Sequence, residues 1–299
     1  IYSTGGTSEI GNSSIFSGYP ALPEISISMH PEKHRKIRTI NEELKSYSTN
    51  YLFGGDLKYE NIGSYFMDHN FQHVEDEKVF PSNLSRGKLN YFDSDLYALL
   101  LKKMNSTKEP FLHCAFTGST HSPYDHPKSK NPRFKGEEAD YMNSMVYADK
   151  CLGDFIANCK TKPWFKNTIF VFVSDHGHPS PGLTNPNSKV FFRIPFLIWG
   201  EELKDTYRGK INDKIGSQAD IAATLLYQVG GNLKKFPWSK DLLNPSCPEF
   251  ALLAINRGYG WVSKKGHYVY QMDSKTELEN SFLKEDQKEE IKNCNAFLT

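Results

Sequence analysis

The stretch IFVFVSDHGHPSPG, residues 169–182, decides how the rest of this sequence is interpreted. It begins with five apolar residues, and Asp175, His176 and His178 follow close behind. A short apolar run of this kind predicts a buried strand, and burying a polar group without a partner costs about 2–7 kcal/mol. A metal ion would satisfy two of these side chains at once. The alternative is that Asp175 caps a turn and both histidines are solvated, and these residues alone leave both interpretations open.

Further apolar runs and helical patterns alternate along the chain. Strands are predicted at 50–53, 111–117, 168–173 and 194–199. Because these runs do not alternate with polar residues, we expect helices to cover both faces of the sheet. Helical periodicity appears between them, at residues 40–47, 93–105, 139–160 and 217–230. The pattern predicts an α/β fold, a three-layer α/β/α sandwich with a mostly parallel central sheet.

The character of the sequence changes near residue 232. The following residues resemble short strands with glycine turns, and a charged helix is predicted at 276–293. We therefore expect a main domain over residues 1–232, with its first strand lying upstream of the given chain. Residues 233–299 are expected to form a small C-terminal antiparallel α+β subdomain.

Polar groups follow three of the predicted strands. Asp175 and His176 follow one strand, Asp56 follows the run at 50–53, and His121 lies just after the run at 111–117. In open α/β sheets, ligands bind at the carboxyl ends of the strands. This placement favours a binding or catalytic site over a set of solvated turns.

Composition narrows the classes of partner. The 299 residues carry 36 Lys and Arg against 35 Asp and Glu, a formal net charge of +1, so no overall field favours nucleic acid. No stretch of about 18 apolar residues and no signal peptide is found, so we expect the chain as given to be soluble. It opens on IYSTGGTSEIG without an initiator Met, and we interpret it as a piece of a longer protein. Among the five cysteines, only Cys247 and Cys294 form a plausible disulfide pair.

A resemblance to a known family is carried by seven stretches in chain order: GGTSEIGNSSIFSGYP, YLFGGDLKYENIGSYF, FTGSTHSPYDHP, YADKCLGDFI, FVSDHGH, RIPFLIWG and SQADIAATLL. In this order they resemble the sulfatase-like branch of the alkaline phosphatase superfamily. The likeness is to the extracytoplasmic catalytic domain of the lipoteichoic acid synthase family in particular, whose relatives include phosphoglycerol and phosphoethanolamine transferases. It covers roughly residues 3–230.

The resemblance implies a metal-dependent nucleophile. Thr7, in Gly-Gly-Thr-Ser-Glu, matches the family's nucleophilic threonine and metal ligand, and Asp175 and His176 match its metal-binding pair. A threonine hydroxyl is a poor nucleophile until a cation lowers its pKa and orients it. The implied cofactor is one divalent metal ion, Mn²⁺ by family precedent, with Zn²⁺ and Mg²⁺ as alternatives. A phosphothreonine intermediate would form and be resolved by an acceptor alcohol or by water.

The resemblance also implies substrate contacts. His121 matches a histidine that contacts the transferred phosphoryl group or the leaving oxygen, and Asp56 would lie in a substrate-side loop. For His178, a substrate-side role and a solvated loop position are both open. The glycerol-phosphate subsite is not carried over, because the positions at which lipoteichoic acid synthases have His, Trp and Arg hold Phe53, Glu60 and Ile62.

One expected ligand is absent from the sequence as given. The family's first metal ligand is a glutamate that ends a strand upstream of the threonine loop, and this chain begins too late to contain it. Glu9 and Glu24 would need a different loop geometry to replace it.

The expected function is a transferase or hydrolase of phosphodiesters, acting on a phosphoglycerol- or phosphoethanolamine-type lipid headgroup. The resemblance places such an enzyme in the cell envelope, at the extracytoplasmic face of the bacterial cytoplasmic membrane, held by an N-terminal membrane region outside the given chain. One alternative is a hydrolase of sulfate esters or phosphomonoesters, although Thr7 cannot be oxidised to the aldehyde of formylglycine sulfatases. A second alternative is a binding module without catalysis.

Overall fold

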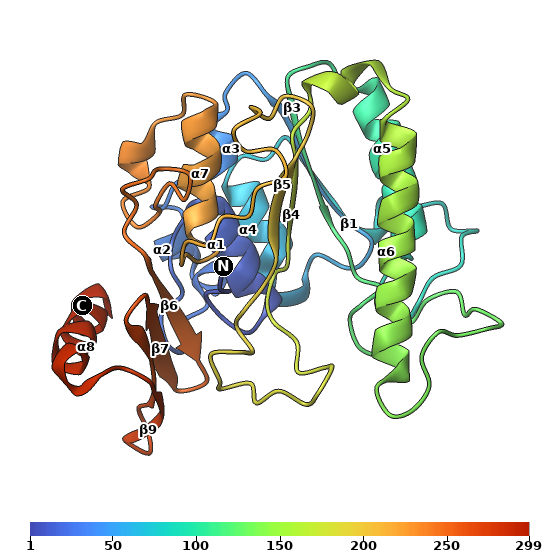
Figure 1. Cartoon of the computed structure of the whole chain (residues 1–299). Helices are drawn as coiled ribbons and strands as arrows, with labels where there is room; N and C mark the ends of the chain where they lie inside the picture. Colours follow the sequence, from blue (N-terminus) through green and yellow to red (C-terminus); the bar gives the residue numbers. More distant parts are fainter. Residues whose placement is uncertain (299) are drawn as a thin grey trace. The chain divides into compact units, whose positions relative to one another are not determined.

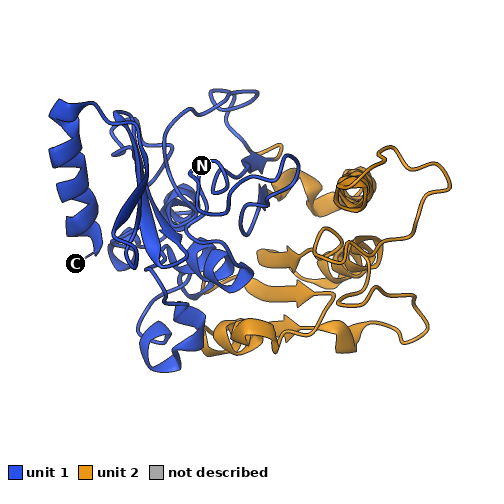
Figure 2. Cartoon of the chain, turned by 90° about the horizontal axis from the view of Figure 1, so that it is seen from below, with its two compact units in different colours: residues 1–43, 170–199, 203–299 blue, residues 44–169, 200–202 orange. Residues whose placement is uncertain are grey.

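The computed structural model describes residues 1–298, and the backbone forms two compact units. Unit 1 comprises Ile1–Glu43, Phe170–Trp199 and Leu203–Thr299, and unit 2 comprises Leu44–Ile169 and Gly200–Glu202 (Figure 2). The chain therefore enters unit 2 twice, once for residues 44–169 and briefly for residues 200–202, and returns to unit 1 each time. The domain boundary expected at residue 232 would cut the chain once, whereas each of these two units combines separate segments. That boundary stays a prediction.

Unit 2 is built on a parallel sheet. Strand β1 (Ser48–Phe53) lies between β2 (His73–Glu75) and β3 (Phe111–Phe116) and runs parallel to both. Its helices are α4 (Ile62–Asp68), α5 (Asp93–Ser106) and α6 (Ala139–Cys159), with short 3-10 turns at Tyr59–Asn61, Glu77–Val79 and Pro163–Asn167. Figure 1 shows α5 and α6 side by side, and the contacts between these two helices agree. Both predicted strands and both predicted helices of this region are present.

Unit 1 holds the other two predicted strands. Strand β4 (Phe170–Val173) pairs with β5 (Phe196–Trp199) in antiparallel orientation, so the mostly parallel arrangement does not extend to this pair. The helices before the C-terminal sheet are α1 (Ser8–Ser17), α2 (Pro31–His34), α3 (Ile40–Glu43) and α7 (Asp220–Gln228), with 3-10 turns at Ile27–Met29 and Leu233–Lys235. Helix α1 packs against α7.

The end of the chain forms the expected antiparallel α+β arrangement. Strands β6 (Phe250–Ile255), β7 (Gly258–Ser263), β8 (Gly266–Gln271) and β9 (Thr276–Asn280) pair in this order, and α8 (Lys284–Leu298) follows. One face packs on Phe191 and Phe192, and the other face packs on α8. The helix predicted at 276–293 begins later, because residues 276–280 pair with β8 instead.

The predicted disulfide is wrong. Cys247 and Cys294 are both buried and free. The thiol of Cys247 donates to the carbonyl of Pro248, 3.4 Å away, and Cys294, on the buried side of α8, packs with Leu252 and Trp261 of the sheet. Burial raises the pKa of the Cys294 thiol to about 12, so this thiol behaves as an apolar core group.

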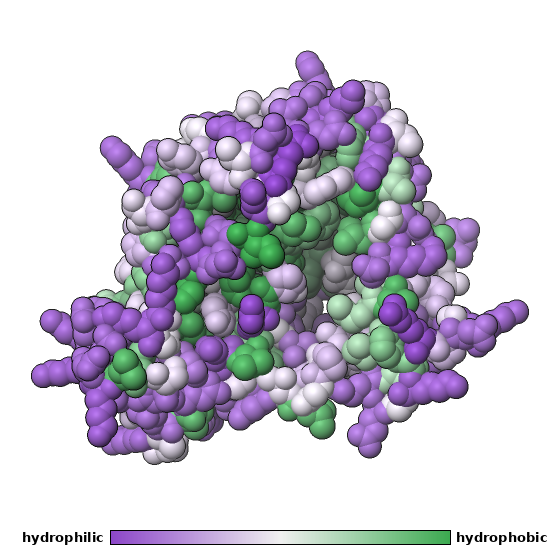
Figure 3. Space-filling model, viewed as in Figure 1, coloured by the Kyte–Doolittle hydropathy of each residue, from purple (hydrophilic) through white to green (hydrophobic). Residues whose placement is uncertain are grey.

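Within residues 1–298, none of the helices combines the length and the apolar character needed to cross a lipid bilayer. Figure 3 shows polar and charged residues over much of one face of the molecule, which agrees with a charged-residue content of 24%.

Candidate active site

Thr7 lies at the N-cap of α1, immediately before its first residue. Its backbone is extended, with φ −135° and ψ 157°, and its side chain is exposed. The hydroxyl makes no capping hydrogen bond, and instead Oγ1 donates to Oε1 of Glu9 over 2.7 Å. Unpaired N–H groups and the helix dipole make the start of a helix attractive to anions. An exposed hydroxyl therefore stands at a position that is attractive to an anionic group.

Helix α1 packs closely against the segment that follows β4. A Cβ atom added to Gly11 would overlap the carbonyl oxygen of Asp175, so no larger residue fits here without a shift of the backbone. The same approach brings the hydroxyl of Ser8 to the carboxylate of Asp175, where Oγ donates to Oδ2 over 2.6 Å. The residue next to Thr7 is thus bonded directly to Asp175.

Asp175 and His176 lie directly after β4, as the sequence predicted, and about a quarter of each side chain is exposed, 27% and 25%. The backbone N–H of His176 donates to Oδ1 of Asp175 over 3.0 Å. Nε2 of His176 lies 3.5 Å from Oδ2 of the same carboxylate. The two side chains therefore converge on one point.

A further hydrogen bond fixes the tautomer of His176. Its Nδ1 lies 2.6 Å from the carbonyl oxygen of Gly177, and because a carbonyl can only accept, Nδ1 carries the hydrogen. In the neutral ring Nε2 then presents a lone pair toward the Asp175 carboxylate. Two ligand atoms about 2.1 Å from one tetrahedral cation lie about 3.4 Å apart, close to the separation of this pair.

Glu9, which the sequence analysis set aside as a metal ligand, contacts Thr7 directly. The residue is 8% exposed, and its Oε2 has no hydrogen-bond partner among the described residues. A buried carboxylate oxygen without a donor is costly, so its presence points to a cation or a donor bound in the working site. Glu9 lies two residues after Thr7, not three as in a capping box, so no standard helix-start motif marks this contact in the sequence.

The side chains near Thr7 are of the types that bind a divalent cation, but too few of the described His, Cys, Asp and Glu side chains lie together to hold one. Carboxylate, imidazole and hydroxyl groups are ligands that manganese, zinc or magnesium accept. Across residues 1–298, however, no group of three or more His, Cys, Asp and Glu side chains is placed to hold a metal. A cation at Asp175 and His176 would therefore need a hydroxyl ligand such as Thr7, or a ligand from elsewhere.

His178 is held in the loop that follows. Its Nδ1 accepts the backbone N–H of Ser180 over 3.0 Å, so in the neutral ring the hydrogen lies on Nε2. This geometry is compatible with donation to an anionic substrate, and the substrate role of His178 stays a prediction.

Asp56 and His121 belong to unit 2, whereas the residues described so far belong to unit 1. Asp56 is exposed after β1, and its Oδ1 accepts the backbone N–H of Lys58 over 2.9 Å. His121 is also exposed, after β3, with Nδ1 donating to the carbonyl of Ser122 over 2.7 Å. Both follow parallel strands as expected, and their contacts with substrate stay predictions.

The loop before His121 is anchored by Asp93, which the sequence analysis did not single out. Oδ1 of Asp93 accepts the backbone N–H groups of Gly118 and Ser119, over 3.0 and 3.1 Å. Asp93 is 1% exposed, and burial raises the pKa of its carboxyl above the ordinary value against the effect of these hydrogen bonds.

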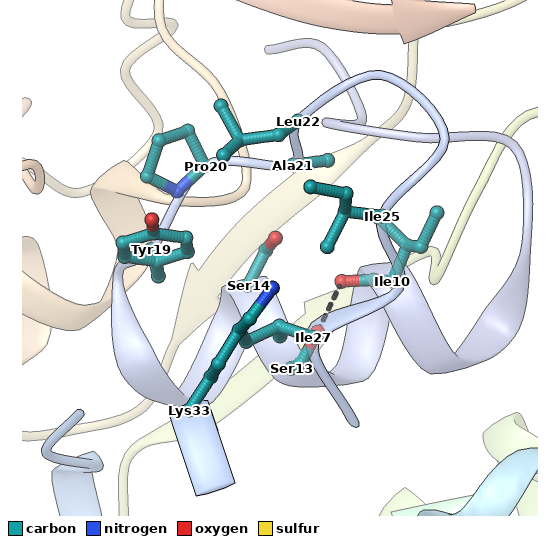
Figure 4. A pocket seen from close by; sticks show the side chains of 10 residues that line it. All are labelled: Ile10, Ser13, Ser14, Tyr19, Pro20, Ala21, Leu22, Ile25, Ile27 and Lys33. Atoms are coloured by element: carbon teal, nitrogen blue, oxygen red, sulfur yellow. Dashed lines mark hydrogen bonds between the residues drawn. The ribbon is translucent and has the colours of Figure 1, made fainter. Parts of the chain in front are cut away.

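A cavity of about 150 Å³ lies on another side of α1. Figure 4 shows mainly apolar side chains around it, with Ser13 of α1 hydrogen-bonded back to the carbonyl of Ile10. Thr7, Asp175 and His176 do not line this cavity, so we separate it from the candidate active site.

The chain resembles known proteins in sequence. The sequence model of the sulfatase family, described as Sulfatase, matches residues 1–231. Phosphoglycerol transferase I from Xanthomonas campestris pv. campestris (strain B100) is 24% identical over 237 residues, covering 75% of this chain and 33% of that protein. The chain thus spans about a third of the length of this curated relative.

Solved structures share the fold. A protein in the alkaline phosphatase superfamily from Vibrio parahaemolyticus superposes with a TM-score of 0.84 at 24% identity, over 99% of this chain and 76% of that one. The lipoteichoic acid synthase LtaP from Listeria monocytogenes gives 0.76 at 19% identity, over 99% and 80%. These likenesses confirm the predicted α/β fold class. Because the family model covers more than half of the chain, residues 1–231 of 299, this protein belongs to the sulfatase family.

Proposed function

We propose that this chain is the catalytic part of a metal-dependent enzyme that transfers or hydrolyses phosphodiesters, with Thr7 as the nucleophile. One observation carries the proposal: the exposed hydroxyl of Thr7 stands at the start of α1, and the adjacent Ser8 is bonded to Asp175 beside His176. The similarity to a phosphoglycerol transferase and to a lipoteichoic acid synthase supports phosphoryl transfer as the reaction.

In the first step, Thr7 would attack the phosphorus of the substrate with the help of Glu9 and the start of α1. A bound divalent cation would supply positive charge and lower the pKa of a hydroxyl that it coordinates. Oε1 of Glu9 already holds the hydrogen of Thr7 Oγ1 and is in place to accept it. A bond then forms from Oγ1 to phosphorus while the bond from phosphorus to the leaving oxygen breaks, and this oxygen takes up a proton from solvent and departs as an alcohol. The N–H groups at the start of α1 face the charge that develops on the phosphoryl oxygens.

The second step returns Thr7 to its starting state. An acceptor alcohol or water attacks the phosphothreonine, so the oxygen of Thr7 leaves and regains a hydrogen. In both steps Ser8 orients the carboxylate of Asp175, and the carbonyl of Gly177 orients the ring of His176. The enzyme would differ from formylglycine sulfatases at this point, because a threonine cannot form their aldehyde.

We further propose manganese as the cation, since its preference for oxygen and imidazole ligands suits this donor set. The proposed donor is a lipid headgroup of the phosphoglycerol or phosphoethanolamine type, handled at the extracytoplasmic face of the bacterial cytoplasmic membrane. The family also favours a second candidate, a sulfate-ester hydrolase on the same fold. The small number of clustered ligands favours a third, a binding module without catalysis.

A panel of substrates tests the proposal. The protein at its natural full length, supplied with Mn²⁺, is assayed on a phosphodiester, a phosphomonoester and a sulfate ester that share one leaving group. We expect the phosphodiester to be the best substrate, and Thr7→Ala to lower its turnover by at least about 10³-fold, as removal of a nucleophile does elsewhere. Thr276→Ala, an exposed threonine of β9, is the matched control and should keep full turnover.

Two results would overturn the proposal. A large preference for the sulfate ester would favour the second candidate. The absence of turnover in both the wild type and Thr7→Ala, together with no bound cation, would favour a binding module.

A further inference from the structure

A buried amide ties together the two segments that carry the candidate active site. Gln218 lies two residues before α7, in the stretch SQADIAATLL, to which no function has yet been assigned here. It is 0% exposed. Buried amides of this size are uncommon in cores unless their polar groups are bonded, so the partners of Gln218 indicate its purpose.

On one side, the side chain holds the segment that leads to Thr7. Oε1 of Gln218 accepts the backbone N–H of Thr4 over 3.0 Å and lies 3.4 Å from the Thr4 hydroxyl. That hydroxyl in turn donates to Ser14 Oγ on α1 over 2.8 Å. The backbone N–H of Gln218 donates to the carbonyl of Tyr2 over 2.9 Å, so main chain and side chain hold the same segment.

On the other side, the side chain holds the segment that carries the Asp-His pair. Nε2 of Gln218 donates to the carbonyl oxygens of Ser174 and Asp175, over 2.7 and 2.5 Å. The amide nitrogen and the amide oxygen of Gln218 are thus both hydrogen-bonded. The Asp175 carbonyl is the same oxygen against which Gly11 of α1 packs.

We propose that Gln218 is a positioning residue, which sets the spacing between Thr7 and the Asp175–His176 pair by bonding both segments at once. The inference rests on the proposed function, because it assumes that Thr7, Asp175 and His176 are the reactive residues. The geometry must be held tightly, because a misplacement of about 1 Å can cost about 10²-fold in rate. Loss of a group that orients metal ligands lowers metal affinity by about 10- to 100-fold in other proteins.

The test separates positioning from simple core stability. Gln218→Met keeps the length of the side chain and removes all its hydrogen bonds. Thr224→Val is the matched control: Thr224 lies on α7, is also 0% exposed, and its hydroxyl bonds to the carbonyls of Asp220 and Lys240, away from both segments. Stability to denaturant, amide hydrogen exchange without metal or substrate, and Mn²⁺ affinity by calorimetry are measured for the full-length protein.

We expect both variants to lose stability, and only Gln218→Met to speed exchange in residues 3–8 and 174–178. The same variant should bind Mn²⁺ about 10- to 100-fold more weakly, whereas Thr224→Val should bind as the wild type does. If Gln218→Met matches Thr224→Val in all three measurements, Gln218 is only a core residue and the inference is wrong.

A second variant covers the case in which Gln218→Met does not fold. Gln218→Asn keeps the amide but is one methylene shorter, so it can reach one segment and not both. Faster exchange in at least one segment is expected, and unchanged exchange in both would refute the inference. Because exchange is measured without metal or substrate, the result stands apart from whether Thr7 proves to be the nucleophile.

Discussion

At the scale of single residues, the site depends on where the Thr7 hydroxyl directs its hydrogen. A threonine at an N-cap usually accepts a backbone N–H of the first turn, which stabilises the helix. Here the hydroxyl donates to Glu9 instead, and the cap is left unused. The arrangement gives up local helix stability and keeps a lone pair of Oγ1 available, which is what a nucleophile requires.

Replacing Glu9 tests this contact. Glu9→Gln keeps the shape of the side chain but removes the charge and the capacity to take a proton, so we expect turnover to fall by about 10²- to 10⁴-fold. Glu24→Gln is the control, because Glu24 lies outside the contacts of Thr7 described here. Equal turnover of the two variants would show that Glu9 has no part in activating Thr7.

At the scale of elements, α1 shows why part of the fold could not be read from the sequence. Its residues, SEIGNSSIFS, are rich in serine and contain glycine, which are poor or middling helix formers, and no helix was predicted over them. The helix forms because it packs on α7 and on the end of β4, contacts that no local pattern displays. The strands and long helices were predictable, since their apolar periodicity is itself local information.

The approach of α1 to β4 can be tested with two glycines. Gly11→Ala places a methyl group on the Asp175 carbonyl, so we expect a loss of about 1–3 kcal/mol of stability and a marked loss of turnover. Gly153→Ala in α6 meets no neighbour within 4 Å, and should raise stability by up to about 1 kcal/mol with turnover unchanged. Thermal and denaturant unfolding of both variants provide the measurement. A Gly11→Ala protein as active and stable as the wild type would contradict the described packing.

Asp93 gives the loop before His121 a dependence on pH. Burial raises the pKa of its carboxyl in the folded protein, so its contribution to stability is greatest below the unfolded pKa and is lost as pH rises through the folded value. Asp93→Asn retains an oxygen for the N–H groups of Gly118 and Ser119 but does not ionise. Its stability relative to the wild type should therefore improve between pH 4 and pH 7, as followed by denaturant unfolding. A relative stability that worsens over this range would show the sign to be wrong.

At the scale of the whole molecule, the sequence predicted which strands are followed by polar candidate site residues, but it did not predict how the chain is divided between two compact units. Asp175 and His176 come together because they are adjacent, and their link to α1 through Ser8 spans a separation of 167 residues that spacing cannot reveal. Asp56 and His121 follow strands of unit 2, so they belong to a different compact unit from Thr7. The bonds of Gln218 likewise connect segments 214 and 43 residues from it, at Thr4 and Asp175.

The central claim is that Thr7 carries the transferred group during turnover. The most direct measurement is the mass of the full-length protein quenched in acid within one turnover of a phosphoglycerol-type diester with Mn²⁺, followed by peptide mapping. The account predicts a mass increase of one phosphoglycerol group located on Thr7 and absent from Thr7→Ala. An adduct on another residue, or turnover that persists in Thr7→Ala, would contradict it.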